Sequence, residues 1–196
     1  MKVASSGFNI TGNFIGGTAP NCGGSAFAIT GAVSYLYNGM DISVGTASAT
    51  SIQNNTFTNF TMSTSNTGST ACVGINIANG AVNIGTVTGN LIGSTTTNGA
   101  ITFTANANTG GFIGIRTGAG GPIVISNNTV SGIDLVGSAT ITPVFNGINA
   151  GGGTPVTISN NTIGSSTLAN SINAVTAYTS TSVQTIRGII VNGGTT

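Results

Sequence analysis

The sequence predicts an all-β chain wound as a single-stranded parallel β-helix, or β-solenoid, of about five coils in one domain, residues 1–196. Five similar segments recur along the chain, an Asn stands at the same place in each of them, and only 3% of the residues are charged. Short β-rich segments that recur in a fixed order stack each strand on its counterpart in the next repeat. Neutral side chains suit such stacking, because like charges about 4.8 Å apart repel each other.

The first motif of each repeat reads as a half-buried strand that ends at a polar turn. In FNITGNFIG, which begins at Phe8, an apolar reference residue is followed three residues later by Asn and two residues after that by a second apolar residue. The small or polar residue after the reference gives the period-two alternation of a strand. The coils start near residues 8, 50, 85, 123 and 156. The reference column is Ile10, Ile52, Val87, Ile125 and Ile158, and the second apolar column is Ile15, Phe57, Ile92, Val130 and Ile163.

The shared Asn predicts a ladder. Identical amides stacked about 4.8 Å apart hydrogen-bond along the stacking axis. Asn also tolerates the left-handed backbone that we expect at the corner where the strand ends. The ladder residues are Asn13, Asn55, Asn90, Asn128 and Asn161.

A second motif, Gly followed by an apolar residue, comes later in every repeat. Its apolar column is Met40, Ile75, Ile115, Ile148 and Ile189. The segment between the two motifs, which we call the excursion, varies in length from repeat to repeat. Weaker strand-like stretches lie in it. These stretches are residues 26–30, 100–104, 139–142 and 175–179.

With these repeats, the chain resembles the right-handed parallel β-helix repeats typified by pectate lyases and related pectin-degrading enzymes. The resemblance implies a right-handed coil, which the spacing alone does not indicate. It also implies that an active member would carry clustered Asp or Glu, often with calcium, and a basic residue over the sugar. Asp41 and Asp134 belong to coils three apart, about 14 Å along the axis, and calcium needs six to eight oxygens. Arg116 and Arg187 are two coils apart, so we expect all these charges to be isolated. Without such clusters, we expect that the chain is not an enzyme and that it binds no cofactor and no metal.

The composition also argues against other classes of function. Without His, a Ser nucleophile lacks its usual base, and a net charge of +1 does not attract nucleic acid. The apolar runs are far shorter than the roughly 20 residues of a membrane span, and no signal peptide is visible. Cys22 and Cys72 either form a disulfide, which implies an oxidising compartment, or stay free, with Cys72 as a buried apolar filler.

The neutral, Asn-, Thr- and Gly-rich coils also resemble the repetitive regions of very large secreted bacterial surface proteins. That resemblance implies a non-catalytic structural module, outside the cell or on its surface, that builds a fibre or forms a section of an adhesin. Because neither end shows a cap, the expected partner is a second copy stacked head to tail or the neighbouring coils of a longer protein.

Two alternatives stay open, an ice-binding solenoid and a degenerate polysaccharide lyase or hydrolase that binds carbohydrate. An ice-binding face would need the same short pair on every coil. Among the outward pairs that flank the reference residues, only Thr86 and Thr88 form a Thr-x-Thr pair.

Overall fold

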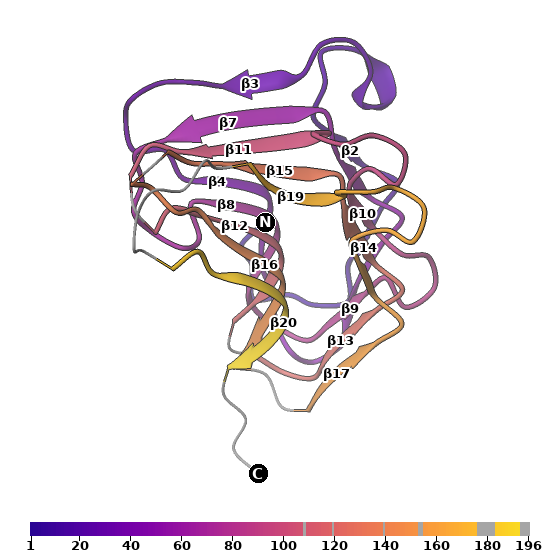
Figure 1. Ribbon diagram of the computed structural model, residues 1–196. Helices are drawn as coiled ribbons and strands as arrows, with labels where there is room; N and C mark the ends of the chain where they lie inside the picture. Colours follow the sequence, from indigo (N-terminus) through magenta and orange to yellow (C-terminus); the bar gives the residue numbers. More distant parts are fainter. Residues whose placement is uncertain (108, 119, 139, 153–154, 176–182, 193–196) are drawn as a thin grey trace.

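The computed structural model describes residues 1–107, 109–118, 120–138, 140–152, 155–175 and 183–192. In this part of the chain, four parallel sheets of five strands each surround one core (Figure 1). The chain passes the sheets in the same order five times, and each pass is one coil. A short 3-10 helix, η1 (Pro20–Cys22), lies in the first coil. The predicted parallel β-solenoid is confirmed.

The strands follow sequence order within every sheet. The first sheet contains β1 (Asn9–Thr11), β5 (Thr50–Gln53), β9 (Val82–Ile84), β13 (Ile123–Ser126) and β17 (Val156–Ser159). The second sheet contains β2 (Phe14–Ile15), β6 (Thr56–Phe57), β10 (Leu91–Gly93), β14 (Thr129–Ser131) and β18 (Thr162–Ile163). The third sheet contains β3 (Phe27–Ile29), β7 (Phe60–Thr64), β11 (Ile101–Ala105), β15 (Ile133–Val136) and β19 (Ile172–Val175). The fourth sheet contains β4 (Tyr37–Ser43), β8 (Cys72–Asn79), β12 (Gly111–Thr117), β16 (Val144–Gly151) and β20 (Ile186–Asn192).

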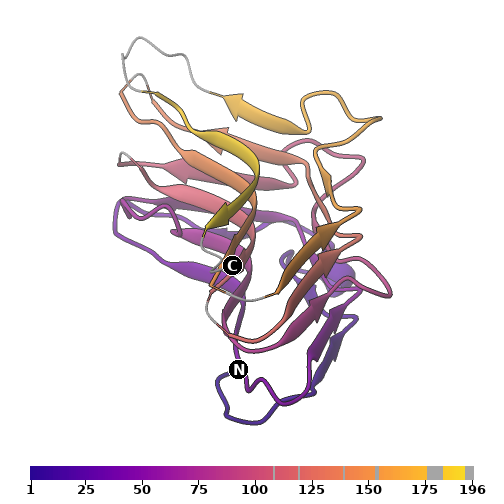
Figure 2. The same ribbon diagram turned by 90° about the horizontal axis from the view of Figure 1, so that it is seen from below.

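The coil is right-handed. Figure 1 looks along the stacking axis, and the chain runs anticlockwise in it from β9 through β10 and β11 to β12. The side view in Figure 2 shows the coils in sequence order along the axis, with the last coil toward the viewer of Figure 1. A chain that turns anticlockwise while it approaches the viewer forms a right-handed helix, as the resemblance to β-helix repeats implied.

Inward-facing side chains from all four sheets fill the core. The second apolar column and the column after the Gly are in register throughout, so that Ile92 pairs with Phe57 and Val130, and Ile115 with Ile75 and Ile148. Phe60, Phe103, Phe112 and Phe145 are among the largest fully buried side chains. Burial of a side chain of this size stabilises the fold by roughly 1.5–3 kcal/mol.

The Gly of the second motif is required by close packing where the fourth sheet approaches the second. A Cβ atom on Gly114 would lie 2.5 Å from the carbonyl oxygen of Gly147 and 2.7 Å from a methyl group of Val130. No side chain fits there without a shift of the backbone. The Gly residues of the neighbouring coils, Gly74 and Gly147, meet the same obstacles.

The third coil corrects the predicted reference column. Ile84 pairs with Ile52 on one side and with Ile125 on the other, and therefore takes the place predicted for Val87. The exposed fraction of Val87 is 85%. The third strand begins at Val82 and not near residue 85, and the Thr86 and Thr88 pair lies after this strand.

Gln53 holds the extra residues of the third coil in place. Its side-chain oxygen accepts hydrogen bonds from the backbone N–H groups of Val87 and Thr88, at 3.0 and 3.2 Å. Its amide nitrogen donates to the carbonyl of Asn83 at 2.9 Å. One side chain thus satisfies a carbonyl group of β9 and two N–H groups of the segment that follows it.

The excursion strands agree only in part with the expectation. The stretches 26–30 and 100–104 coincide with β3 and β11. The prediction of a strand at residues 139–142 is wrong for residues 140–142, and residue 139 lies outside the described residues; the strand is β15, Ile133–Val136, whose residues continue the register of β11. In the last coil the strand is β19, and residues 176–179 lie outside the described residues.

Candidate functional site

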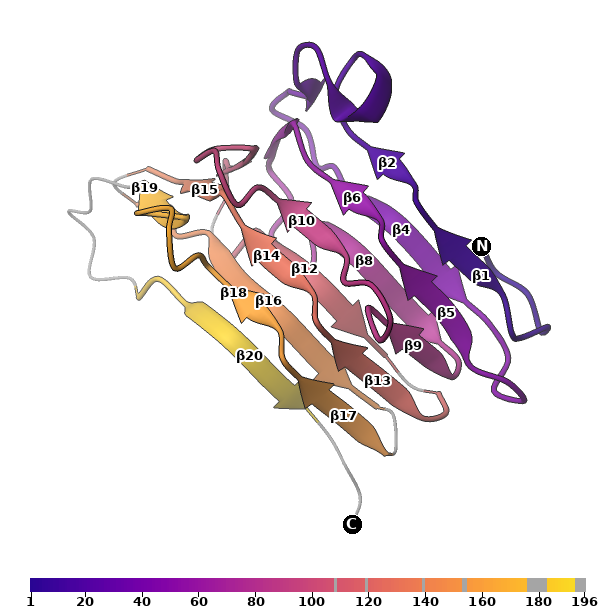
Figure 3. The same cartoon turned by 90° about the vertical axis from the view of Figure 1, so that its right-hand side faces the viewer.

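The predicted ladder lies at the corner where the first sheet turns into the second (Figure 3). From Asn13 to Asn128, each ladder Asn donates from Nδ2 to Oδ1 of the Asn in the next coil, over 2.8–3.0 Å. Its backbone N–H donates to the same Oδ1 atom. From the second coil on, Nδ2 also donates to the carbonyl of the reference residue in the preceding coil, as Asn90 does to Ile52. The ladder is therefore directional, because every Oδ1 faces the preceding coil.

In four of the five coils, the left-handed backbone at this corner falls on the residue before the ladder Asn, and not on the ladder Asn as we expected. Asn54, Asn127 and Asn160 have φ angles of 53°, 60° and 55°, and Gly12 has a φ angle of 68°. Asn and Gly are the residues that tolerate this conformation best. The Asn-Asn pairs of the sequence thus combine a corner residue with a ladder residue.

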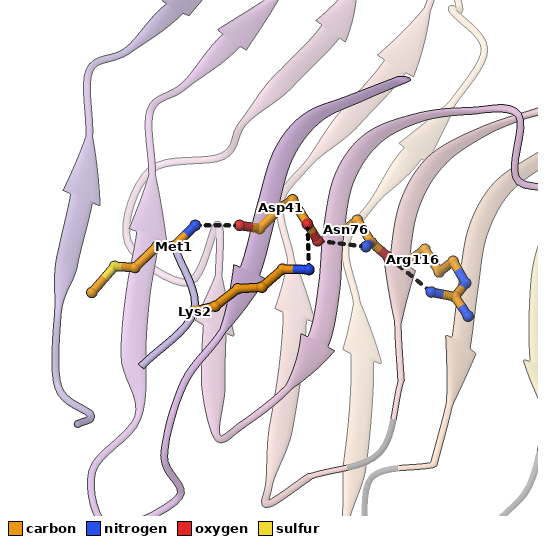
Figure 4. A network of polar contacts seen from close by, with 5 residues as sticks. All are labelled: Met1, Lys2, Asp41, Asn76 and Arg116. Atoms are coloured by element: carbon orange, nitrogen blue, oxygen red, sulfur yellow. Dashed lines mark hydrogen bonds and ion pairs between the residues drawn. The ribbon is translucent and has the colours of Figure 1, made fainter. Parts of the chain in front are cut away.

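Three of the five charged side chains meet in one row on the outer face of the fourth sheet (Figure 4). Lys2 forms an ion pair with Asp41 at 3.1 Å. Asn76 donates to Asp41 at 2.9 Å, and Arg116 donates to Asn76 at 2.9 Å. The row corrects the expectation of isolated charges, which failed because Asp41, Asn76 and Arg116, 35 and 40 positions apart along the sequence, occupy one register position.

In this row, neighbouring positive charges and hydrogen-bond donors compensate the negative charge of the Asp41 carboxylate. Partial burial of Asp41 would raise its pKa, but hydrogen bonds from Lys2 and Asn76 and the nearby positive charges outweigh that cost and lower the pKa below its usual value. A carboxylate held in the charged form and bonded on both sides stabilises the row. It does not act as a proton donor near neutral pH.

Asp134 and Arg187 lie apart from this row and from each other. Asp134 is on β15, in register with Thr102 and Asn173. Arg187 is on β20, opposite Asn146. Asp41 and Asp134 therefore belong to different sheets as well as to different coils.

The described residues contain no group of three or more His, Cys, Asp or Glu side chains placed to hold a metal ion. Among the same residues, no helix is both long enough and apolar enough to cross a bilayer.

Both cysteines are free. Burial raises the pKa of Cys72, which lies inside the core opposite Phe112. Burial also raises the pKa of Cys22, against hydrogen bonds to the backbone of Thr58 and Ile15 that lower it. Because the thiolate is the reactive form, burial lowers the reactivity of both thiols.

The part of the chain that the structure describes includes two hollows. One lies inside the core beside Gly74 and Ile92 and has a volume of about 10 Å³, which is too small for an organic ligand. The other is a surface pocket of about 220 Å³, lined by Cys22, Thr58, Asn59, Ser94, Thr97 and Ala100. It contains no charged side chain, and Nδ2 of Asn59 already donates to the carbonyls of Cys22 and Gly24.

Among the described residues, the outer faces of the first and third sheets carry no uniform row of short hydroxyl side chains. On the third sheet, the pairs Thr61/Ser63 and Thr102/Thr104 are followed in register by Asp134/Val136. On the first sheet, one outward row is Asn9, Ser51, Asn83, Val124 and Thr157. A lattice-matching surface would need the same pair on successive coils, and neither sheet has it.

The sequence predicted the ladder but missed Gln53 and the row around Asp41. The signal for Gln53 was present, because Val82 to Ile84 already shows the alternation of a strand before the segment that resembles FNITGNFIG. Comparison of the chain with protein-family models, curated proteins and solved structures found no match. The fold and the ladder define the chain as a parallel β-solenoid repeat protein.

Proposed function

We propose that the chain is a non-catalytic structural module of an extracellular fibre or of a surface adhesin. The observation that carries this proposal is the direction of the polar groups. The ladder amides bond along the axis from Asn13 to Asn161, so that this continuous polar array holds the coils together and does not converge on a pocket.

The same construction supports a mechanical role. Each coil joins the next through four parallel strand pairings and one ladder rung. Five strands stacked about 4.8 Å apart give a section of rod about 24 Å long. Because the strand pairings join each coil only to its neighbours, the rod can be lengthened by further coils without a change in its cross-section.

The burial of both thiols supports a location outside the cell. A free, exposed cysteine forms mixed disulfides in an oxidising environment, whereas the thiols of Cys22 and Cys72 are withdrawn from solvent and have raised pKa values. The module therefore tolerates oxidising surroundings without cross-linking through its native cysteines.

The test combines location with activity. Immunogold labelling of cells that produce the chain is expected to place it on the surface or in extracellular fibres. Incubation of the purified chain with pectin-like and other polysaccharides is expected to release no product, and the Asp41→Asn variant is the matched control for contaminating activity. A cytoplasmic location, or product release that Asp41→Asn abolishes, would overturn the proposal. Retention on a polysaccharide without cleavage would replace it with the carbohydrate-binding alternative.

A further inference from the structure

We infer that the fifth coil of one copy docks on the first coil of a second copy, head to tail, with the Asn ladder continuing across the joint. This inference rests on the proposed structural function and specifies the partner and its register. Both ends of the solenoid expose strand edges, β17 to β20 at one end and β1 to β4 at the other. Exposed edges of this kind pair readily with further strands.

The hydrogen-bonding groups of the two ends are complementary. Within the solenoid, Asn128 donates from its backbone N–H and from Nδ2 to Oδ1 of Asn161, at 3.0 Å each. By the same geometry, the N–H of Asn161 points toward a sixth coil. Among the described residues, none donates to Oδ1 of Asn13, which faces away from the second coil. One end therefore offers donors and the other offers an acceptor at the same place in the cross-section.

The apolar columns of the two ends also match. Ile186 and Ile189 of β20 face inward, yet their exposed fractions are 46% and 49% because no coil covers them. Continued register sets Ile186 on Tyr37 and Ile189 on Met40 of the second copy. It likewise sets Ile172 on Phe27, whose exposed fraction is 39%. Apolar side chains thus meet apolar side chains in all three columns.

Only a head-to-tail arrangement satisfies these groups. All strand pairings along the axis are parallel, and a head-to-head joint would make them antiparallel and set acceptor against acceptor in the ladder. A head-to-tail joint is heterologous and does not close, so it leads to a fibre. Like charges do not meet in it, because Arg187 falls on Asn38 and Ile190 falls on Asp41.

Residues 1–3 limit the length of the joint. Lys2 pairs in parallel with Ser43, Met1 donates from its amino group to the carbonyl of Asp41 at 2.6 Å, and Ser43 donates to the carbonyl of Met1 at 2.7 Å. Met1 therefore lies where Val191 of the preceding copy would fall. The joint pairs β20 with β4 up to Ile190, and Val191 and Asn192 have to leave the register there, because residues 1–3 occupy the rest of the edge of β4.

Cysteine pairs test the register directly. Asn9 and Thr157 are exposed and occupy one outward row, so the Asn9→Cys/Thr157→Cys variant brings two Cα atoms of different copies to about 5 Å, within disulfide range. Mild oxidation is expected to give a series of covalent oligomers that reductant dissolves. The matched control, Asn9→Cys/Ser159→Cys, shifts the pair by two residues to about 8 Å, beyond that range. A product that stays monomeric, or equal cross-linking of both pairs, would overturn the inference.

Sedimentation velocity gives an independent measurement. In Ile189→Lys, the free chain can extend the Lys through the open end into solvent, but the joint would bury its charge. We expect this variant to need at least tenfold more protein for half-assembly, whereas Val183→Lys, whose parent side chain is 83% exposed, changes that concentration less than twofold. Thermal melting by circular dichroism checks that both fold. Assembly by folded Ile189→Lys at wild-type concentration contradicts the joint.

The two proposals fail separately. A chain that is inert and located on the cell surface but does not cross-link loses the joint and keeps its proposed function. A chain that cross-links in register but releases product, or stays in the cytoplasm, loses the proposed function and keeps the joint.

Discussion

The inner and outer coils of the solenoid carry the same motifs in different surroundings. Asn90 and Asn128 are almost fully buried and bonded to rungs on both sides, whereas Asn13 is exposed and bonded on one side only. Phe103 has no exposed surface, whereas the exposed fraction of Phe27 in the same sheet is 39%. The difference indicates that much of the stability comes from the contacts between coils, as in other repeat proteins. The same motif therefore contributes less to stability in a coil that lacks a neighbour on one side.

The largest expected effect comes from the core. Phe103→Ala removes a fully buried ring from the third coil and is expected to lower the free energy of unfolding by about 3–5 kcal/mol. Phe27→Ala at the open end is expected to cost less than about half of that, because part of the ring is already in water. Denaturant unfolding of both variants, at a concentration where the chain is monomeric, checks the difference. Equal losses would contradict the comparison of inner with outer coils.

The ladder is expected to show the same contrast on a smaller scale. Asn128→Ala removes the acceptor of the Asn90 backbone N–H and the amide that bonds the carbonyl of Ile84, both buried, and is expected to cost about 1–3 kcal/mol. Asn13→Ala removes one bond to Asn55, whose Oδ1 keeps the bond from the backbone N–H of residue 13, so we expect a loss below about 1 kcal/mol. Thermal melts of the two variants measure the contrast, and an unchanged melt of Asn128→Ala would refute the structural role of the ladder.

Gln53 tests the irregular third coil against the regular ones. Gln53→Ala leaves the N–H groups of Val87 and Thr88 without their acceptor and is expected to cost about 1–2 kcal/mol. Ser159 is an exposed outward residue of the corresponding strand in the fifth coil, and Ser159→Ala is expected to change the stability by less than about 0.5 kcal/mol. Chemical denaturation compares them, and hydrogen exchange at Val87 and Thr88 is expected to rise only in the Gln53 variant.

The smallest expected effect concerns the charged row at the first coil. The folded state lowers the pKa of Asp41, so the row stabilises the fold above the unfolded pKa of about 4 and loses this contribution as the pH falls through the folded pKa. Because Lys2 is 69% exposed and Asp41 32% exposed, we expect less than about 1 kcal/mol. Melts between pH 7 and pH 2 are expected to show a smaller acid destabilisation in Asp41→Asn than in Asp134→Asn. If stability falls with pH equally in both variants, Asp41 is not the source of the acid destabilisation.

Features that repeat locally could be predicted from the sequence. The ladder positions follow from one Asn per repeat, and the column from Ile15 to Ile163 follows from an apolar residue two places later. These predictions hold because the side-chain period of a strand and the geometry of a corner are decided by neighbouring residues. The error at Val87 arose where an insertion copied the motif itself, since GTVTGNLIG resembles FNITGNFIG more closely than does the strand that precedes it.

The sequence by itself determined the class of fold, the polar corner and the neutral character of the stacked rows, because each depends on spacing within a few residues. Only the tertiary structure decided which residues share a register position. That choice depends on the whole path of the chain around each coil, and the excursions differ in length, so Lys2, Asp41 and Arg116 meet although the sequence keeps them apart. It also decided that Oδ1 of Asn13 and the N–H of Asn161 face outward at opposite ends, because the direction of a ladder exists only once its coils are stacked.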